Sequence, residues 1–89
     1  MTTDAAPDLS ALTRFLDAAW LQRGLSENTR MAYHSDLEHF ARWLLERGET
    51  LLEVRRETVL EYLSWRLEAG YKARSSARFL SGARGFYQF

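Results

Sequence analysis

The sequence lacks several features that would place it in other structural classes. It has no cysteine, which excludes a disulfide framework and a thiolate metal site and fits a reducing compartment such as the cytoplasm. Its one proline is Pro7, so no proline interrupts a helix over the rest of the chain. No apolar run approaches the roughly 18–20 residues of a membrane span, and the first residues do not form a secretion signal. These absences indicate one small domain in 89 residues, with no membrane partner.

Catalytic patterns are equally scarce. The five glycines are dispersed, so no glycine-rich loop can cradle a phosphate, and no Ser/His/Asp set is recognisable. The two histidines, His34 and His39, lie five residues apart and would point in different directions on a helix. A solvated helix face is the favoured interpretation of this pair, and a metal site is the alternative. We therefore predict no catalytic residue, no metal and no cofactor.

The C-terminal segment contains no acidic side chain. All 12 Asp and Glu lie in residues 1–68 with eight Arg, so that part carries a formal charge of 8 − 12 = −4. Residues 69–89 carry +4, and the net charge of zero conceals this separation. The four cations are Lys72, Arg74, Arg78 and Arg84. Such a segment suits a polyanionic partner, because phosphate contacts supply most non-specific affinity for nucleic acid. A solvated basic face is the alternative.

Start and stop signals divide the chain into helical segments. Asp8 can cap a first helix that Gly24 ends, and Ser26 can cap a second that stops at Gly48. Apolar residues recur at spacings of three and four, which is the period of an amphipathic helix. We therefore predict an all-α fold with four helices. They cover residues 9–23, 26–47, 56–69 and 74–89, after a disordered lead-in over 1–8 and with a short apolar connector over 49–54.

The fourth segment is predicted to present a basic face to solvent. Arg74, Ser75 and Arg78 would point outward together, at a helix start whose free N–H groups favour an anion. Gly82 and Gly85 weaken the helix but permit close approach of another backbone. The residues predicted to face the core are Ala77, Leu80, Ala83 and either Phe86 or Tyr87. The aromatic residues that fit the helical stripes least are predicted to form an exposed patch: Trp65, Phe79, Tyr87 and Phe89.

A second polar cluster begins the longest predicted helix. Ser26, Asn28, Thr29 and Arg30 lie at its first turn, and Tyr33 follows one turn later. Asn can read an adenine edge, and Arg can reach guanine or phosphate. The alternative is that Ser26 simply caps the helix while Asn28 and Thr29 are solvated, and the sequence alone favours this alternative.

Two runs of residues resemble the N-terminal core-binding domain of the tyrosine recombinase, or phage integrase, family. The first is Ser26-Glu27-Asn28-Thr29, followed by Tyr33, Asp36-Leu37 and Phe40. The second is Gly70-Tyr71-Lys72-Ala73, followed by Ser75-Ser76-Ala77-Arg78 and Leu80-Ser81, and it is most similar to the XerD type. The resemblance covers residues 9–89 and implies a SAM-like four-helix bundle of orthogonal hairpins that forms half of a clamp around duplex DNA.

The resemblance also implies partners and contact residues. It places the second and fourth helices toward the major groove of duplex DNA, at a recombination half-site. The DNA-contacting residues that it implies are Ser26, Asn28, Thr29, Arg30, Tyr33, Lys72, Arg74, Ser75, Ser76 and Arg78. It further implies a nucleoid-associated recombinase that assembles with other protomers, among them a XerC-like partner, in a synaptic tetramer.

The catalytic residues of the family belong to a C-terminal domain that is absent from this sequence. We therefore expect a truncated or excised domain that binds DNA without cleaving it. Gly82 and Gly85 depart from the family pattern, which favours helix formers or a cation at those positions. The leading alternative is a helical protein–protein adaptor whose C-terminal aromatic residues dock a partner. A small metal-dependent enzyme is a third interpretation, and it rests only on His34 and His39.

Overall fold

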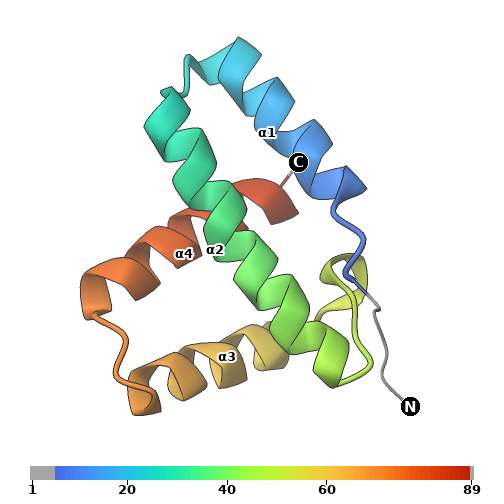
Figure 1. The fold of residues 1–89 in the computed structure, drawn as a ribbon, viewed down its shortest axis with the longest axis vertical. Coiled ribbons are helices and arrows are strands. Elements are labelled where there is room, and N and C mark those ends of the chain that lie inside the picture. The colour runs from blue at the N-terminus through green and yellow to red at the C-terminus, as the bar shows by residue number, and fades with distance from the viewer. Residues whose placement is uncertain (1–5, 89) are drawn as a thin grey trace.

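The computed structural model describes residues 6–88, and its regular elements are helices (Figure 1). They are α1 (Ser10–Arg23), α2 (Glu27–Glu46), the short 3-10 helix η1 (Leu51–Glu53), α3 (Arg56–Glu68) and α4 (Ala73–Tyr87). Helices α1 and α2 form one hairpin, α3 and α4 form another, and α4 crosses α2 steeply (Figure 1). The predicted all-α fold is confirmed. Most of the lead-in predicted over 1–8, and the last residue of the predicted fourth helix, lie outside the described residues.

Local signals set the end of α1 and the start of α2 as predicted, whereas the N-cap of α1 is Leu9 instead of the predicted Asp8, and no side chain caps this helix. Gly24 ends α1 in the left-handed conformation, with φ of 64°, and its N–H donates to the carbonyl of Trp20. Ser26 caps α2, because its hydroxyl oxygen accepts the N–H of Thr29 at 3.1 Å. Asp8 accepts the N–H of Ser10 at 3.0 Å, so it supports the start of α1 from one residue before the N-cap.

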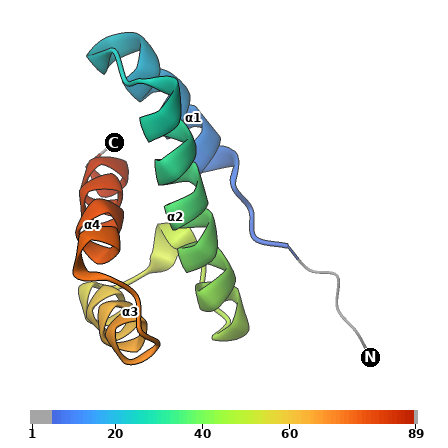
Figure 2. The same cartoon turned by 60° about the vertical axis from the view of Figure 1, so that its left-hand side comes forward.

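Helix α2 occupies the centre of the molecule. It contacts α1, η1 and α4, and α3 contacts α4 (Figures 1 and 2). Seen from the second direction, α3 and α4 lie on one side of α2 (Figure 2). The largest fully buried side chains come from all four α-helices: Leu12, Leu37, Phe40, Leu44, Tyr62 and Phe79. Within the described residues, no helix combines the length and the apolar character that crossing a bilayer requires.

Aromatic rings hold α4 and α3 against α2. The ring of Phe40 lies 4.7 Å from that of Tyr62 and 5.2 Å from that of Phe79, and the last two lie 5.0 Å apart. Trp43 and Trp65 continue the cluster to the surface, at 5.1 and 5.7 Å from Tyr62. Each fully buried ring stabilises the fold by about 1.5–3 kcal/mol, so this cluster fixes where α4 lies.

The predicted core face of α4 is partly wrong. The structure buries Phe79, together with Gly82, Ala83 and Phe86, whereas Ala77 and Leu80 are exposed. A row of residues spaced by three winds around a helix of 3.6 residues per turn, so Ala77 and Phe86 lie on opposite sides. Spacings that alternate between three and four keep the buried residues on one side. Of the predicted aromatic patch, Trp65 and Tyr87 are exposed, Phe79 is not, and Phe89 lies outside the described residues.

The two glycines of α4 admit aromatic rings rather than another backbone. A Cβ atom placed on Gly82 would lie 3.1 Å from Cδ1 of Tyr33, and one on Gly85 would lie 3.2 Å from Cζ of Phe15. Both distances are tighter than ordinary carbon–carbon contact, which is about 3.5–4.0 Å. Glycine at these positions therefore lets α4 settle on α2 and α1.

Candidate nucleic-acid interface

The polar cluster at the start of α2 first serves the helix itself. The hydroxyl of Ser26 donates to Oγ1 of Thr29 at 2.9 Å and accepts the N–H of the same residue, so both residues are engaged in the cap. Asn28 is exposed, and its side chain has no hydrogen bond to the described part of the chain. The capping interpretation of Ser26 is thus confirmed, while DNA contact by Asn28 stays a prediction.

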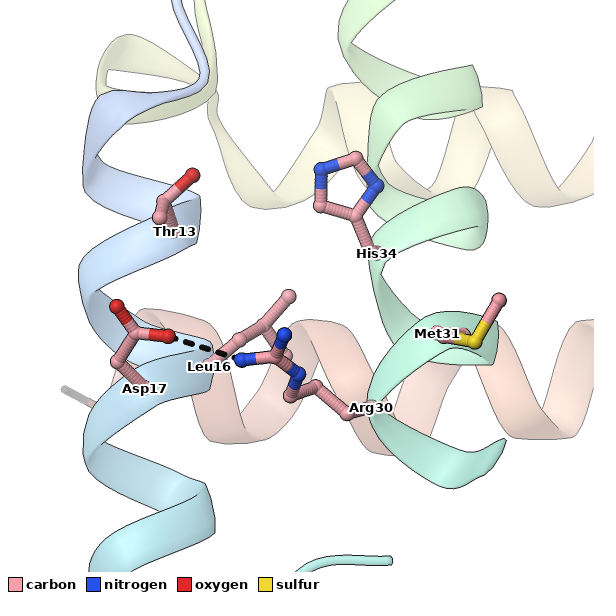
Figure 3. Close-up of a pocket in the computed structure, with 6 residues that line it drawn as sticks. All are labelled: Thr13, Leu16, Asp17, Arg30, Met31 and His34. Carbon is pink, nitrogen blue, oxygen red and sulfur yellow. Dashed lines mark hydrogen bonds and ion pairs between the residues drawn. The ribbon is translucent and has the colours of Figure 1, made fainter. Parts of the chain in front are cut away.

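Arg30 is directed toward α1. Its Nη1 lies 3.0 Å from Oδ1 of Asp17, and its guanidinium lies 4.5 Å from the ring centroid of Trp20 (Figure 3). The pair spans a shallow hollow of about 360 Å³ between α1 and α2. The hollow is lined by Thr13, Leu16, Asp17, Arg30, Met31 and His34. The exposed carboxylate of Asp17 therefore compensates the charge of Arg30. An ion pair at the surface stabilises the fold by at most about 1 kcal/mol.

Tyr33 joins the first cluster to α4. Its ring packs against Gly82, as the close approach to a hypothetical Cβ shows. One turn of helix separates Tyr33 from Thr29, so both lie on the side of α2 that meets α4. The structure therefore brings Tyr33 to the basic helix and leaves Arg30 on the other side, with α1.

The start of α4 carries positive charge without a cap. Lys72 is the N-cap residue, no side chain caps the helix, and its first turn contains no acid. Lys72 and Arg74 are exposed, and neither forms an ion pair within residues 6–88. Unpaired N–H groups and the helix dipole both favour an anion at such an end. Phosphate contact at this helix start stays a prediction.

Arg66 holds the two serines of this first turn. Its Nε donates to Oγ of Ser76 at 3.0 Å, and its Nη2 donates to Oγ of Ser75. Arg66 is 3% exposed and lies under the ring of Tyr71, with 4.3 Å between guanidinium and ring centroid. No carboxylate of the described residues pairs with it. Sequence reasoning missed Arg66, although its place one turn after the buried Tyr62 was a signal that it faces inward.

Arg78 is bound to a carboxylate of α2. Its Nε and Nη2 donate to Oδ2 and Oδ1 of Asp36, each at 2.7 Å. The Asp36 side chain is 7% exposed and that of Arg78 is 49% exposed, so the pair lies at the edge of the core. Hydrogen bonds from the guanidinium to Asp36 raise the pKa of Arg78. Asp36 was noticed in the sequence only as part of a family pattern, and its partner could not be read from positions 42 residues apart.

The four cations of the C-terminal segment thus differ in their surroundings. Arg78 is neutralised by Asp36, whereas Lys72, Arg74 and Arg84 are exposed and have no ion pair within the described residues. The basic character of α4 therefore comes from three of the four predicted cations. Arg84 was recognised as a cation but was not among the predicted contacts.

The two histidines do not form part of a metal-binding group. His34 lies beside Glu38 one turn away, with 3.7 Å between Nδ1 and Oε1, and His39 is exposed. In residues 6–88, no three His, Cys, Asp or Glu side chains are grouped so that they could hold a metal ion.

Comparison with known proteins shows which family the chain matches. The profile described as "Phage integrase, N-terminal SAM-like domain" matches residues 12–89. No solved structure matches the chain significantly. The match begins at the third residue of α1 and extends through α4.

Similar proteins include several tyrosine recombinases. The chain is 58% identical to the tyrosine recombinase XerD of Pseudomonas aeruginosa over 78 residues, which are 88% of this chain and 26% of that protein. It is 51% identical to XerD of Pseudomonas putida over 94% of the chain and 28% of the relative. It is 42% identical to XerD of Yersinia pestis over 92% of the chain and 27% of the relative. The chain therefore spans about a quarter of the length of these curated relatives. It belongs to the family of phage integrase N-terminal SAM-like domains.

Proposed function

We propose that this chain is the DNA-binding, core-binding domain of a XerD-like site-specific recombinase and that it clamps duplex DNA at a recombination half-site. The observation that carries the proposal is helix α4 with its N-cap residue: no side chain caps the helix, it contains no acid, and Lys72, Arg74 and Arg84 are exposed without an ion pair in the described residues. Sequence similarity to XerD recombinases supports the same conclusion. Its cellular functions would be DNA integration, recombination and chromosome dimer resolution, in association with the nucleoid.

The start of α4 is proposed to bind a phosphate group of the duplex. Three kinds of donor meet there: the free N–H groups of the first turn, the exposed side chains of Lys72 and Arg74, and the hydroxyls of Ser75 and Ser76. Both serine oxygens accept hydrogen bonds from Arg66, so their own O–H groups are left to donate outward. Phosphate contacts of this type position a protein on DNA without reading its sequence.

The start of α2 is proposed as the second contact. Tyr33 packs on Gly82, so the second turn of α2 lies against the basic helix. Asn28 and Thr29 would contact the backbone or the bases there, next to the capping Ser26. Arg30 would have to leave Asp17 to reach the duplex, so we expect its contribution to be smaller than that of Arg74.

We propose that this domain contributes no catalytic group. The family's catalytic residues belong to a separate C-terminal domain, and the chain matches the N-terminal domain alone. In a whole recombinase, exposed apolar side chains such as Leu21, Leu60 and Leu67 would contact other protomers or the catalytic domain.

The same apolar surface favours one alternative function, a helical protein–protein adaptor. Leu67 of α3 is 75% exposed and Leu60 is 55% exposed, beside the partly exposed Trp65. An adaptor would bind its partner through this surface and would have no particular affinity for duplex DNA.

Binding of a labelled duplex, measured by fluorescence anisotropy, separates the two functions. The duplex should carry a Xer-type recombination half-site, a scrambled duplex is the control, and the titration is repeated at two salt concentrations. The proposal predicts tighter binding to the half-site and a log–log salt slope of about 0.9 for each phosphate contact. A folded chain that binds neither duplex at low salt would refute the proposal and favour the adaptor.

A further inference from the structure

We propose that the outer face of α3 is a docking site for a basic amphipathic helix of another protein. The inference goes beyond the proposed function, because this face lies on a different helix from the proposed DNA contacts and carries the opposite charge. We define the outer face of α3 by six exposed residues: Glu57, Leu60, Glu61, Ser64, Trp65 and Glu68.

The outer face runs along most of the length of α3. Its members follow one another at spacings of three, one, three, one and three, which keeps them on one side of a helix. The buried side is formed by Thr58, Tyr62 and Arg66. Eleven residues separate Glu57 from Glu68, which is about 16 Å along the axis, or about three turns. Helix α3 lies at the end of the molecule opposite the turn between α1 and α2 (Figure 1). A helix of similar length can therefore lie along the outer face.

Helix α2 borders the outer face and makes it concave. A shallow hollow of about 560 Å³ lies between the end of α2 and α3, and Trp43 and Arg47 form its α2 side. The indole rings of Trp43 and Trp65 lie 6.4 Å apart. Leu60 is 55% exposed and Trp65 is 40% exposed, so the hollow presents apolar surface to solvent. An exposed apolar patch with a polar rim is typical of a protein-interaction site.

The charge of the hollow is negative. Among the described residues that line it, Arg47 is the one cation, and it is held by Glu49 and Glu61, each at 3.1 Å. Glu57 and Glu68 also line the hollow, and neither forms an ion pair within residues 6–88. The hollow therefore carries two unpaired carboxylates about three turns apart, with apolar side chains between them.

These features determine the chemistry of the partner. An amphipathic helix that crosses the hollow would bury its apolar side on Leu60 and Trp65. Its Lys or Arg side chains would reach Glu57 and Glu68, and a cation could also lie over the indole of Trp65. An acidic helix would bring like charges together. A second copy does not fit either, because a two-fold dimer through this face would set the same carboxylates against one another.

Tryptophan fluorescence provides the test, because two of the three tryptophans line the hollow. The probe is a helical peptide of about 15 residues with leucine on one side and lysine on the other, long enough for about four turns. The same peptide with glutamate in place of lysine is the control. Binding is titrated by fluorescence with the 89-residue chain.

Matched variants distinguish the hollow from the rest of the surface. Glu57→Gln/Glu68→Gln removes the two unpaired carboxylates, and Asp17→Asn/Glu27→Gln removes two carboxylates that do not line the hollow. Leu60→Ser is compared with Leu21→Ser, which changes an exposed leucine of α1. The changed side chains are exposed, and circular dichroism checks that each variant is folded.

The inference predicts a saturable fluorescence change at concentrations of the lysine peptide below about 1 mM. Glu57→Gln/Glu68→Gln and Leu60→Ser should each weaken peptide binding about fivefold. The two control variants should stay within about twofold of the parent. The affinity of Glu57→Gln/Glu68→Gln for the half-site duplex should also stay within about twofold, because these residues lie outside the proposed DNA contacts.

Several outcomes would overturn the inference. Equal weakening by the hollow variants and their controls would show a general attraction of the peptide to an acidic domain. Equal binding of the glutamate peptide, or no binding of the lysine peptide up to about 1 mM, would exclude a basic partner. A dimer in analytical ultracentrifugation that Leu60→Ser dissociates would make the occupant a second copy. These outcomes leave the proposed function standing, since that function fails only if the parent chain binds neither duplex.

Discussion

The two polar helix starts, at α2 and α4, differ in how their hydrogen bonds are completed. Helix α2 is capped by its own Ser26, and its Arg30 is paired with Asp17. Helix α4 has no side-chain cap, and its serines are held from another helix, by Arg66. The first start has a side-chain cap and a paired arginine, whereas the second leaves N–H groups and cations open to an anion.

This difference teaches that a count of cations does not identify a binding surface. Both starts contain Arg, Ser or Thr side chains, and both look suitable for phosphate in the sequence. The decisive property is which charges remain unpaired once the chain folds. Arg30 and Arg78 are neutralised by Asp17 and Asp36, which come from other helices, and Arg74 is not.

The largest predicted loss of stability comes from removing the aromatic ring that packs α4 against α2 and α3. Phe79→Ala should lower the free energy of unfolding by about 3–5 kcal/mol, because Phe79 is fully buried against Phe40 and Tyr62. Leu80→Ala is the neighbouring control, and it should cost less than about 1 kcal/mol because Leu80 is partly exposed. Urea denaturation measures both. Similar losses of unfolding free energy in the two variants would contradict the observed orientation of α4, which buries Phe79 and leaves Leu80 partly exposed.

The next effect separates the paired arginine from an unpaired one. Arg78→Ala should lower the free energy of unfolding by about 2–3 kcal/mol, because it leaves the buried Asp36 carboxylate without its donors. Arg74→Ala, on the same helix, should change it by no more than about 0.5 kcal/mol. Thermal and urea denaturation test this contrast. Equal stability of the two variants would show that the Asp36 pair does not hold the helices together.

A smaller effect tests the cap of α2. Ser26→Ala should cost about 1 kcal/mol, because the N–H of Thr29 loses its acceptor. Ser35 is an exposed serine inside the same helix, so Ser35→Ala is the control and should be neutral or slightly stabilising. Urea denaturation is again the measurement. A neutral Ser26→Ala would mean that water replaces the cap without loss.

The smallest effect concerns the exposed pair on α1. Asp17→Asn should cost about 0.5 kcal/mol or less, because the Asp17 side chain is exposed and the pair is screened by salt. The same change frees Arg30, so affinity for duplex DNA at low salt should rise by about twofold or less. Anisotropy with the half-site duplex checks this. A large gain in affinity would give Arg30 and the α2 start a greater share of binding than we propose.

The sequence predicted the helices well because their signals are local. Gly24 and Ser26 act on backbone groups within four residues, and the structure shows both as predicted. The side of α4 that faces the core was predicted less well. Ala77 and Leu80 were assigned to the core by a spacing of three, but residues at that spacing do not stay on one side of a helix. The bulk of Phe79 decided which side is buried.

The candidate site was predictable in charge but not in pairing. The absence of acids over 69–89 correctly located the basic helix. The partners of its polar residues lie on other helices: Asp36 is 42 residues from Arg78, and Arg66 is nine residues from Ser75. Contacts of that kind depend on the crossing of α2, α3 and α4, which no local pattern encodes.

The most direct test of the account is an NMR titration of the isotopically labelled chain with the half-site duplex. The account predicts that amide shifts concentrate on the start of α4, including Lys72, Arg74, Ser75 and Ser76, with smaller shifts at the start of α2. Shifts centred on the exposed face of α3, around Leu60 and Leu67, would contradict it and would locate the partner surface there.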